Sequence, residues 1–210
     1  MVIVINIGVL AMQGSVNEHL RMLSRIRGIN PCEVRLESDL EMVSGLILPG
    51  GESTTIGRLL KDSGLDEKII KRAHEGMPLW GTCAGMILLA KEIVNENYFH
   101  LGLMDIVVRR NAYGGQLNSF ISKMKVPQVS NDVIPLVFIR APWVERVGGN
   151  VKVLAKFNGR IIAVQQNNLL ATSFHPELTG DLSFHQYFVK IVERYKQDKK
   201  AALQLPFCGG

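Results

Sequence analysis

One of three cysteines lies in the segment GTCAG (residues 81–85), between a short apolar run and a stretch with helical spacing. The pattern Gly-x-Cys-x-Gly is typical of a sharp strand-to-helix turn, where small flanking residues expose the middle side chain. Cys83 would also stand at the positive end of the dipole of an expected helix, residues 86–93, which favours the thiolate. Cys83 is therefore a candidate nucleophile, although free cysteine is also a common buried core residue.

A histidine and a carboxylate that suit such a nucleophile lie in SFHPEL (residues 173–178). Pro176 disfavours the helical conformation for His175, so the segment should be extended, and residues two apart then face the same side. Glu177 can orient the imidazole while its second nitrogen meets a nucleophile. Alone, a His-x-Glu pair is more often a surface hydrogen bond; together with Cys83 it predicts a catalytic triad.

Two successive glycines lie in LILPGGESTT (residues 46–55), between an apolar strand and an expected helix start at Ser53 or Thr54. Glycines let the backbone approach a ligand and turn its N–H groups inward. One such group can complete an oxyanion hole. The alternatives are an ordinary turn or a phosphate loop, but the Gly-Lys-Ser/Thr ending of a P-loop is absent.

The segments that position these residues alternate between strand-like and helical patterns in the first half of the chain. Strands are expected at residues 3–10, 32–36, 45–51 and 78–81, and helices at 15–26, 54–62 and 65–75. This alternation predicts an α/β fold with a central, mostly parallel sheet covered on both faces. Ligands bind beyond the carboxyl ends of such strands, where the three candidate loops lie.

From about residue 100 the pattern becomes β-rich, with short apolar segments separated by Gly, Asn and Pro. The segments are LMDIVVRR (103–110), SFISKMKV (119–126), LVFIRAP (136–142), VKVLAKF (151–157), RIIAVQQ (160–166) and LLATSFHP (169–176). A last helix is expected at residues 181–197, with Phe184, Phe188, Ile191 and Tyr195 on one face.

Composition indicates one domain of ordinary size, since 210 residues with 47% hydrophobic content can bury a core. We expect that domain over residues 1–196 and a frayed tail at 197–210. Cys32, Cys83 and Cys208 lack the spacing of a disulfide framework or a zinc site. We therefore treat Cys83 as a free thiol.

Charge and hydropathy restrict the partners. The longest apolar stretch, residues 2–12, is too short to cross a bilayer and lacks the features of a signal peptide, so we expect a soluble, cytoplasmic protein with no membrane partner. The net charge of +5 comes from basic residues scattered among 19 acidic ones. Without a basic stripe, no nucleic-acid partner is expected.

The order of PGGES (49–53), GTCAG (81–85) and SFHPE (173–177) resembles the class I, or triad, glutamine amidotransferases. Longer segments resemble the glutaminase subunits of pyridoxal 5'-phosphate synthase within that class. These segments are IGVLAMQGSVNEH (7–19), GLILPGGESTT (45–55), HLGLMDIVVRRNAYGGQLNSF (100–120), FIRAP (138–142) and SFHPELT (173–179). The resemblance covers residues 7 to about 196 and implies a three-layer, flavodoxin-like sandwich.

The resemblance also implies a role for each matched residue. Cys83 is the implied nucleophile, His175 the general acid and base, and Glu177 its orienting carboxylate. The backbone N–H groups of Gly51 and Ala84 are the implied oxyanion hole. The residues implied to bind glutamine are Gly51, Glu52, Ser53, Arg110, Ile139 and Arg140. An arginine or a backbone N–H suits the carboxylate of glutamine, and an acceptor suits its ammonium group.

The implied reaction is hydrolysis of L-glutamine to L-glutamate and ammonia, through a thioester on Cys83. It needs no metal and no cofactor. The resemblance implies that the ammonia passes to a separate synthase subunit that makes pyridoxal 5'-phosphate. Because an ungoverned glutaminase would waste glutamine, we predict that the Gly50–Gly51 peptide is adjustable and that Gln13, in the loop 11–15, senses the docked partner.

One departure from the family pattern is visible: Gly115 stands where an arginine is usual. This leaves one contact near the binding loop in doubt but does not touch the triad. Three alternatives remain open: a different flavodoxin-like cysteine hydrolase or chaperone-type protein, a glutaminase subunit that serves another synthase, and a non-catalytic binding module. Glutamate release from glutamine separates the catalytic readings from the others.

Overall fold

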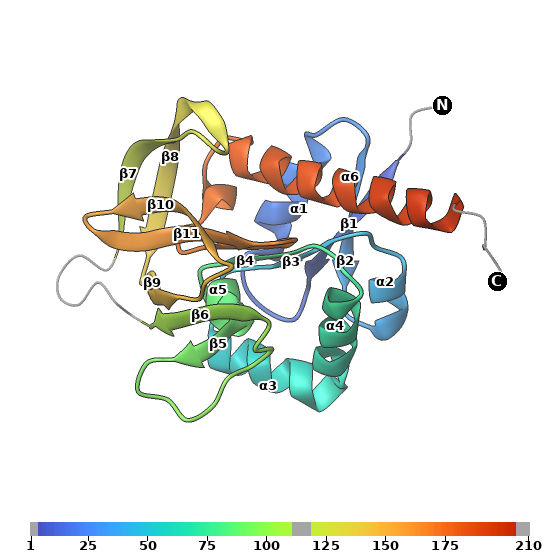
Figure 1. Cartoon of the computed structure of the whole chain (residues 1–210), viewed down its shortest axis with the longest axis horizontal. Coiled ribbons are helices and arrows are strands. Elements are labelled where there is room, and N and C mark those ends of the chain that lie inside the picture. The colour runs from blue at the N-terminus through green and yellow to red at the C-terminus, as the bar shows by residue number, and fades with distance from the viewer. Residues whose placement is uncertain (1–3, 111–118, 205–210) are drawn as a thin grey trace.

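The computed structural model describes residues 4–110 and 119–204, and a sheet of ten strands forms its centre (Figure 1). The strand order is β2-β1-β3-β4-β12-β11-β9-β6-β5, with β10 paired to β11. Neighbours from β2 to β12 are parallel. These five strands are β1 (Ile5–Leu10), β2 (Ile29–Val34), β3 (Leu46–Leu48), β4 (Leu79–Thr82) and β12 (Leu169–Thr172).

The other half of the sheet is mixed. Its pairs are antiparallel except for β5 with β6. The strands are β5 (Ala90–Ile93), β6 (Met104–Arg109), β9 (Trp143–Val147), β10 (Lys152–Phe157) and β11 (Arg160–Gln166). A separate antiparallel pair, β7 (Ser119–Val126) with β8 (Ser130–Ile139), packs over it. The predicted α/β fold with a β-rich second half is confirmed.

Helices cover both faces of the sheet. Figure 1 shows α1 and α6 on one side and α3, α4 and α5 on the other. The helices are α1 (Val16–Ser24), α2 (Glu37–Glu41), α3 (Ser53–Ser63), α4 (Leu65–His74), α5 (Ala84–Leu89) and α6 (Ser183–Gln204), with a 3₁₀ turn η1 (Pro176–Leu178) before α6. The sheet and its two coverings form the predicted three-layer arrangement.

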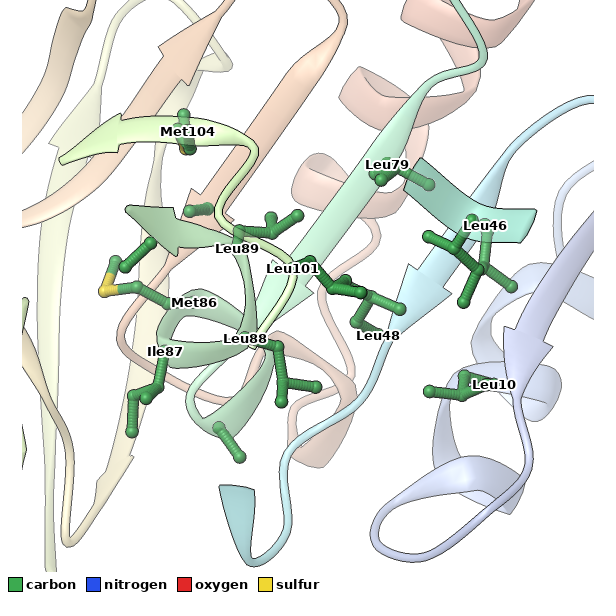
Figure 2. Close-up of a cluster of buried hydrophobic side chains, with 14 of the residues drawn as sticks. Leu10, Leu46, Leu48, Leu79, Met86, Ile87, Leu88, Leu89, Leu101 and Met104 are labelled. Atoms are coloured by element: carbon green, nitrogen blue, oxygen red, sulfur yellow. The ribbon is translucent and has the colours of Figure 1, made fainter. Parts of the chain in front are cut away.

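The parallel strands are apolar on both faces because each face packs against its own core. On β3, Leu46 and Leu48 join the core beneath α3, α4 and α5, whereas Ile47 between them joins the core beneath α1 and α6 (Figure 2). Leu79 and Trp80 on β4 divide in the same way. This two-residue alternation fixes the register of the strands and therefore where each of them ends.

Three elements differ from the sequence expectation. The helix expected at residues 86–93 is α5, which begins two residues earlier and stops at Leu89, because Ala90–Ile93 pairs with β6 as an edge strand. Strand β9 was not predicted at all. Helix α6 runs to Gln204 rather than to 197, so residues 197–204 continue the helix, while 205–210 lie outside the described residues. None of the helices in the described ranges is long and apolar enough to span a membrane.

Candidate active site

The loops after β1, β3, β4 and β12 meet at one edge of the sheet. These strands are parallel neighbours, so their carboxyl ends lie side by side. A pocket of about 380 Å³ opens there. Nine sequence-predicted residues line it: Gly51, Glu52, Ser53, Cys83, Ala84, Arg110, Ile139, Arg140 and His175. Glu177 does not line the pocket; it lies fully buried beside His175.

Cys83 occupies the sharp turn between β4 and α5. Its φ of 48° is positive, a region that residues other than glycine rarely adopt and that stores about 1–3 kcal/mol of strain. The backbone N–H of Cys83 donates to Thr172 at 2.8 Å, which ties the turn to β12. A side chain at Gly81 would overlap the backbone of Gly85, so the turn closes only with a glycine there.

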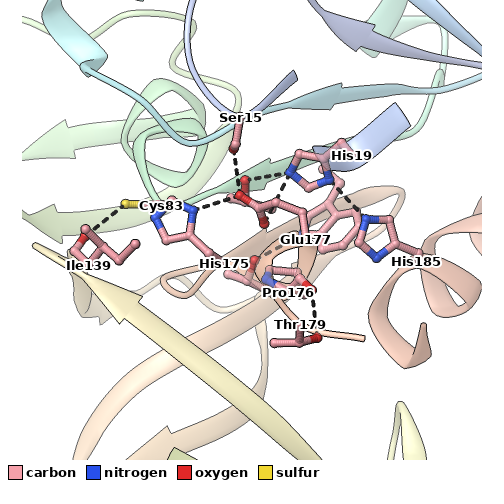
Figure 3. Close-up of polar contacts among 12 residues, drawn as sticks. Ser15, His19, Cys83, Ile139, His175, Pro176, Glu177, Thr179 and His185 are labelled. Atoms are coloured by element: carbon pink, nitrogen blue, oxygen red, sulfur yellow. Dashed lines mark hydrogen bonds and ion pairs between the residues drawn. The ribbon is translucent and has the colours of Figure 1, made fainter. Parts of the chain in front are cut away.

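The thiol of Cys83 lies between two groups. Its Sγ is 3.7 Å from the carbonyl oxygen of Ile139, at the end of β8. The imidazole of His175 lies beside it and interacts with it (Figure 3). The thiol is 7% exposed as a residue and faces the pocket, so Cys83 is an accessible nucleophile rather than a core residue.

His175 and Glu177 form the predicted pair. His175 has an extended backbone, with φ −107°, just before η1. Its Nδ1 lies 2.7 Å from Oε1 of Glu177, and its backbone N–H donates to Val137 at 2.8 Å. The sequence argument from Pro176 predicted this geometry, in which the carboxylate orients the ring and leaves Nε2 for the pocket side.

The electrostatics of the pair favour an imidazolium beside a carboxylate. Burial lowers the pKa of His175, but hydrogen bonds and charges from Cys83 and Glu177 outweigh it and raise the pKa to about 10. Burial raises the pKa of Glu177, but the nearby His19, His175 and Ser15 lower it to about 2. The site therefore holds a proton on His175 at neutral pH, ready for a leaving group.

The glycine turn after β3 is held by the loop 11–15. The carbonyl oxygen of Gly50 accepts from the backbone N–H of Ser15 at 3.0 Å, and the backbone N–H of Glu52 donates to Oε1 of Gln13 at 2.9 Å. A side chain on Gly50 would overlap the ring of His175. The turn is thus fixed between the first loop and the triad, and Gln13, the predicted sensor, contacts it directly.

Arg110 is held beside the pocket by acidic and phenolic neighbours. Its guanidinium lies 3.3 Å from Glu52, 3.6 Å from Glu96 and 3.0 Å from the hydroxyl of Tyr98. This arginine was weighed against a solvated charge at a strand end, but its side chain is only 23% exposed. Arg140 also lines the pocket, with a φ of 44°. Gly115, the departure from the family pattern, lies outside the described residues.

Three polar residues near the triad were missed by the sequence reasoning. Ser15 donates its hydroxyl to Oε1 of Glu177 at 2.6 Å. His19 on α1 and His185 on α6 are both fully buried and lie 3.0 Å apart. Each histidine lies on the apolar face of an amphipathic helix, and this placement was the available signal.

The chain matches the SNO glutamine amidotransferase family over residues 9–194. It belongs to that family. A relative from Caldanaerobacter subterraneus subsp. tengcongensis, "Pyridoxal 5'-phosphate synthase subunit PdxT", is 55% identical over 185 residues, 88% of this chain and 98% of the relative. The same name is carried by a Dehalococcoides mccartyi protein that is 54% identical over 193 residues, 90% of this chain and 98% of that protein.

A solved structure supports membership of this glutamine amidotransferase family. "Crystal structure of glutamine amidotransferase" is 45% identical, with a TM-score of 0.84, and covers 89% of this chain and 98% of that one. The predicted family is confirmed, and the chain is an enzyme of the glutamine amidotransferase class. More distant neighbours, such as "Structure of PurLQS from Thermotoga maritima" at 19% identity and a TM-score of 0.64, share the fold.

Proposed function

We propose that this chain hydrolyses L-glutamine to L-glutamate and ammonia with Cys83, His175 and Glu177, and that it supplies the ammonia to a pyridoxal 5'-phosphate synthase subunit. One observation carries the proposal: His175 lies between the thiol of Cys83 and the buried carboxylate of Glu177, at a pocket beyond the parallel strands. Family membership supplies the substrate class, and the names of the relatives supply the destination of the ammonia.

The first half of the reaction forms a thioester. The thiolate of Cys83 attacks the side-chain amide carbon of glutamine, and the carbonyl oxygen becomes an oxyanion. We assign the backbone N–H groups of Gly51 and Ala84 to that oxyanion. His175 then gives its proton to the amide nitrogen, the C–N bond breaks, and ammonia leaves.

The second half releases glutamate. His175, now neutral, takes a proton from water, and the resulting hydroxide adds to the thioester carbon. The C–S bond breaks and restores the thiolate beside an imidazolium. Glu177 stays ionised throughout and holds the ring in place, since its pKa is lowered to about 2.

The pocket has charges for both ends of the amino-acid group. We assign the carboxylate of glutamine to Arg110 and Arg140, and its ammonium to Glu52, whose pKa is lowered by Thr54 and by the two arginines. Ser53 and Ile139 complete the binding residues by lining the same pocket. The single domain over residues 1–196 and the cytoplasmic location remain predictions of the sequence.

The test is glutamate release from glutamine by the purified chain, with and without the synthase subunit. We expect release with the synthase, and none from Cys83→Ala under the same conditions. Full activity in Cys83→Ala would overturn the assignment of the nucleophile. Release without any effect of this synthase would favour a glutaminase subunit that serves another one.

A further inference from the structure

A buried pair of histidines extends the triad into the interior. His19, on the inner face of α1, places Nε2 at 3.4 Å from Oε2 of Glu177 and at 3.2 Å from the hydroxyl oxygen of Thr82. Its Nδ1 lies 3.0 Å from Nε2 of His185 on α6 (Figure 3). All four residues are 0% exposed, so water does not screen these contacts.

The two oxygens of Glu177 have different surroundings. Oε1 accepts from both Ser15 and His175, at 2.6 Å and 2.7 Å. Oε2 is buried without a hydrogen bond of ordinary length among the described residues, and His19 faces it. A carboxylate held at one oxygen only can turn about its terminal bond, so a donor at Oε2 fixes the plane that presents Oε1 to His175.

The histidine pair determines which nitrogen carries a proton. Burial lowers the pKa of His19 and lowers the pKa of His185 well below its usual value, so both rings are neutral at pH 7. The charged groups that act on the pair are Glu177, His175, Glu18 and Arg25, and burial outweighs them.

Nδ1 of His185 is buried without a partner in the described part of the chain. An unpaired acceptor there is less costly than an unpaired N–H, and so the proton of His185 belongs on Nε2, which donates to Nδ1 of His19. His19 must then carry its own proton on Nε2, aimed at Glu177 and Thr82.

We propose that His19 is a positioning residue of the glutaminase: as a neutral Nε2–H tautomer set by His185, it holds Oε2 of Glu177 and so aligns the carboxylate with His175. The proposal rests on the proposed function of the triad. His19 does not line the pocket and touches no reacting atom. Its effect on glutamine hydrolysis passes through Glu177.

Two substitutions separate a positioning role from a packing role. His19→Leu keeps an apolar volume and removes the donor; His19→Gln keeps an amide N–H at a similar reach. With the synthase present, His19→Leu should lower kcat about tenfold or more, the size expected for losing a hydrogen bond to a charged group. KM should stay within about twofold. His19→Gln should recover most of kcat.

Met22→Ala is the matched control for stability. Met22 is 1% exposed on the same helix and joins no contact with Glu177. Its cavity should destabilise α1 without changing kcat per folded molecule. If Met22→Ala and His19→Leu lose kcat in the same proportion to their loss of folded protein, His19 is only a packing residue and the proposal is wrong.

A second readout does not depend on glutamine turnover. The rate of Cys83 alkylation by iodoacetamide against pH reports the thiolate, in a Cys32→Ser background. In His19→Leu a loosely held Glu177 stabilises the imidazolium of His175 less, so the thiolate should appear at higher pH than in the unmodified chain. An unchanged profile in folded His19→Leu overturns the proposal. Because this assay uses no substrate, its outcome stands apart from failure of the glutaminase function.

The unmodified protein provides a test without any folding risk. Imidazole ¹⁵N spectra from pH 5.5 to 8.5 should show that His19 and His185 do not titrate and that both carry the proton on Nε2. A His100→Gln variant removes the signals of the other partly buried histidine, which lies outside this network. A titrating ring, or an Nδ1–H tautomer in either member of the pair, contradicts the proposal.

Discussion

The backbone N–H of Ser15 donates to the carbonyl oxygen of Gly50 at 3.0 Å, while the hydroxyl of the same serine donates to Glu177 at 2.6 Å. One residue of the first loop therefore contacts both the candidate oxyanion turn and the acid of the triad. A shift of this loop would move both together. The loop is well placed to report on a docked partner, as the sequence predicted for its neighbour Gln13.

The first prediction concerns covalent labelling. A diazoketone analogue of glutamine should modify Cys83 and leave Cys32 unmodified at pH 7. Burial, with the charge of Asp39, raises the pKa of the Cys32 thiol, so little nucleophilic thiolate forms there. Peptide mapping by mass spectrometry measures the site. Glutamine in excess should protect Cys83, and label found mainly on Cys32 would end the assignment.

The second prediction orders the triad substitutions. Cys83→Ala removes the nucleophile and should abolish turnover, and His175→Asn should come close to it. Glu177→Gln should lose less, up to about 10⁴-fold in kcat by comparison with serine triads. Steady-state glutamate release with the synthase measures all three. Ser15→Ala, which removes one donor to Glu177, should lose only about tenfold; a fully active His175→Asn protein would refute the order.

The third prediction separates two adjacent arginines. Arg110→Gln should raise KM for glutamine roughly 10- to 100-fold, the size of a hydrogen bond to a charged group, and leave kcat within a few-fold. Arg109→Gln is the matched control, because Arg109 pairs with Glu145 at 3.0 Å and does not line the pocket. Initial rates over a range of glutamine concentrations decide. Equal effects of the two substitutions would remove Arg110 from the binding residues.

The fourth prediction follows from the raised pKa of His175. Its folded value of about 10 lies above its ordinary 6.5, so its stabilising contribution is complete below pH 6.5 and is lost as pH rises through 10. The urea midpoint should therefore fall across this window more in the unmodified chain than in His175→Asn. Glu177, with a pKa lowered to about 2, contributes fully above pH 4.5 and does not confuse the comparison. Parallel curves for the two proteins would contradict the raised value.

The fifth prediction concerns the partner. The Gly50–Gly51 peptide is the adjustable donor of the oxyanion hole, and losing one such donor costs about 10²- to 10³-fold in turnover in other hydrolases. We expect the isolated chain to show little glutaminase activity and the synthase to raise it at least about tenfold. Assays over a range of synthase concentrations test this. Equal rates for the free chain and the complex would show that no such gate exists.

The triad could be predicted because its evidence is local in the sequence. Cys83 between small residues, and His175 before a proline and two residues from Glu177, each fix a short backbone geometry. The alternation of strands and helices likewise predicted the parallel half of the sheet. These features need no knowledge of distant contacts.

The remaining features depend on contacts that no local pattern records. Residues 90–93 continue an apolar helical pattern, yet they pair with β6 because an open sheet edge is available there. Ser15, His19 and His185 meet Glu177 only when α1 and α6 pack on the same face of the sheet. The sequence showed two histidines on apolar helix faces, but not that they would meet.

The position of β12 between β4 and β11 has a consequence for synthesis on the ribosome. The cysteine follows β4, whereas the histidine and glutamate follow β12, about ninety residues later in the chain. A nascent chain that has released its nucleophile therefore still lacks its base and its pocket wall. Until translation is almost complete, the growing polypeptide has no means of breaking down glutamine, and the central gap in its sheet stays open for a chaperone to cover.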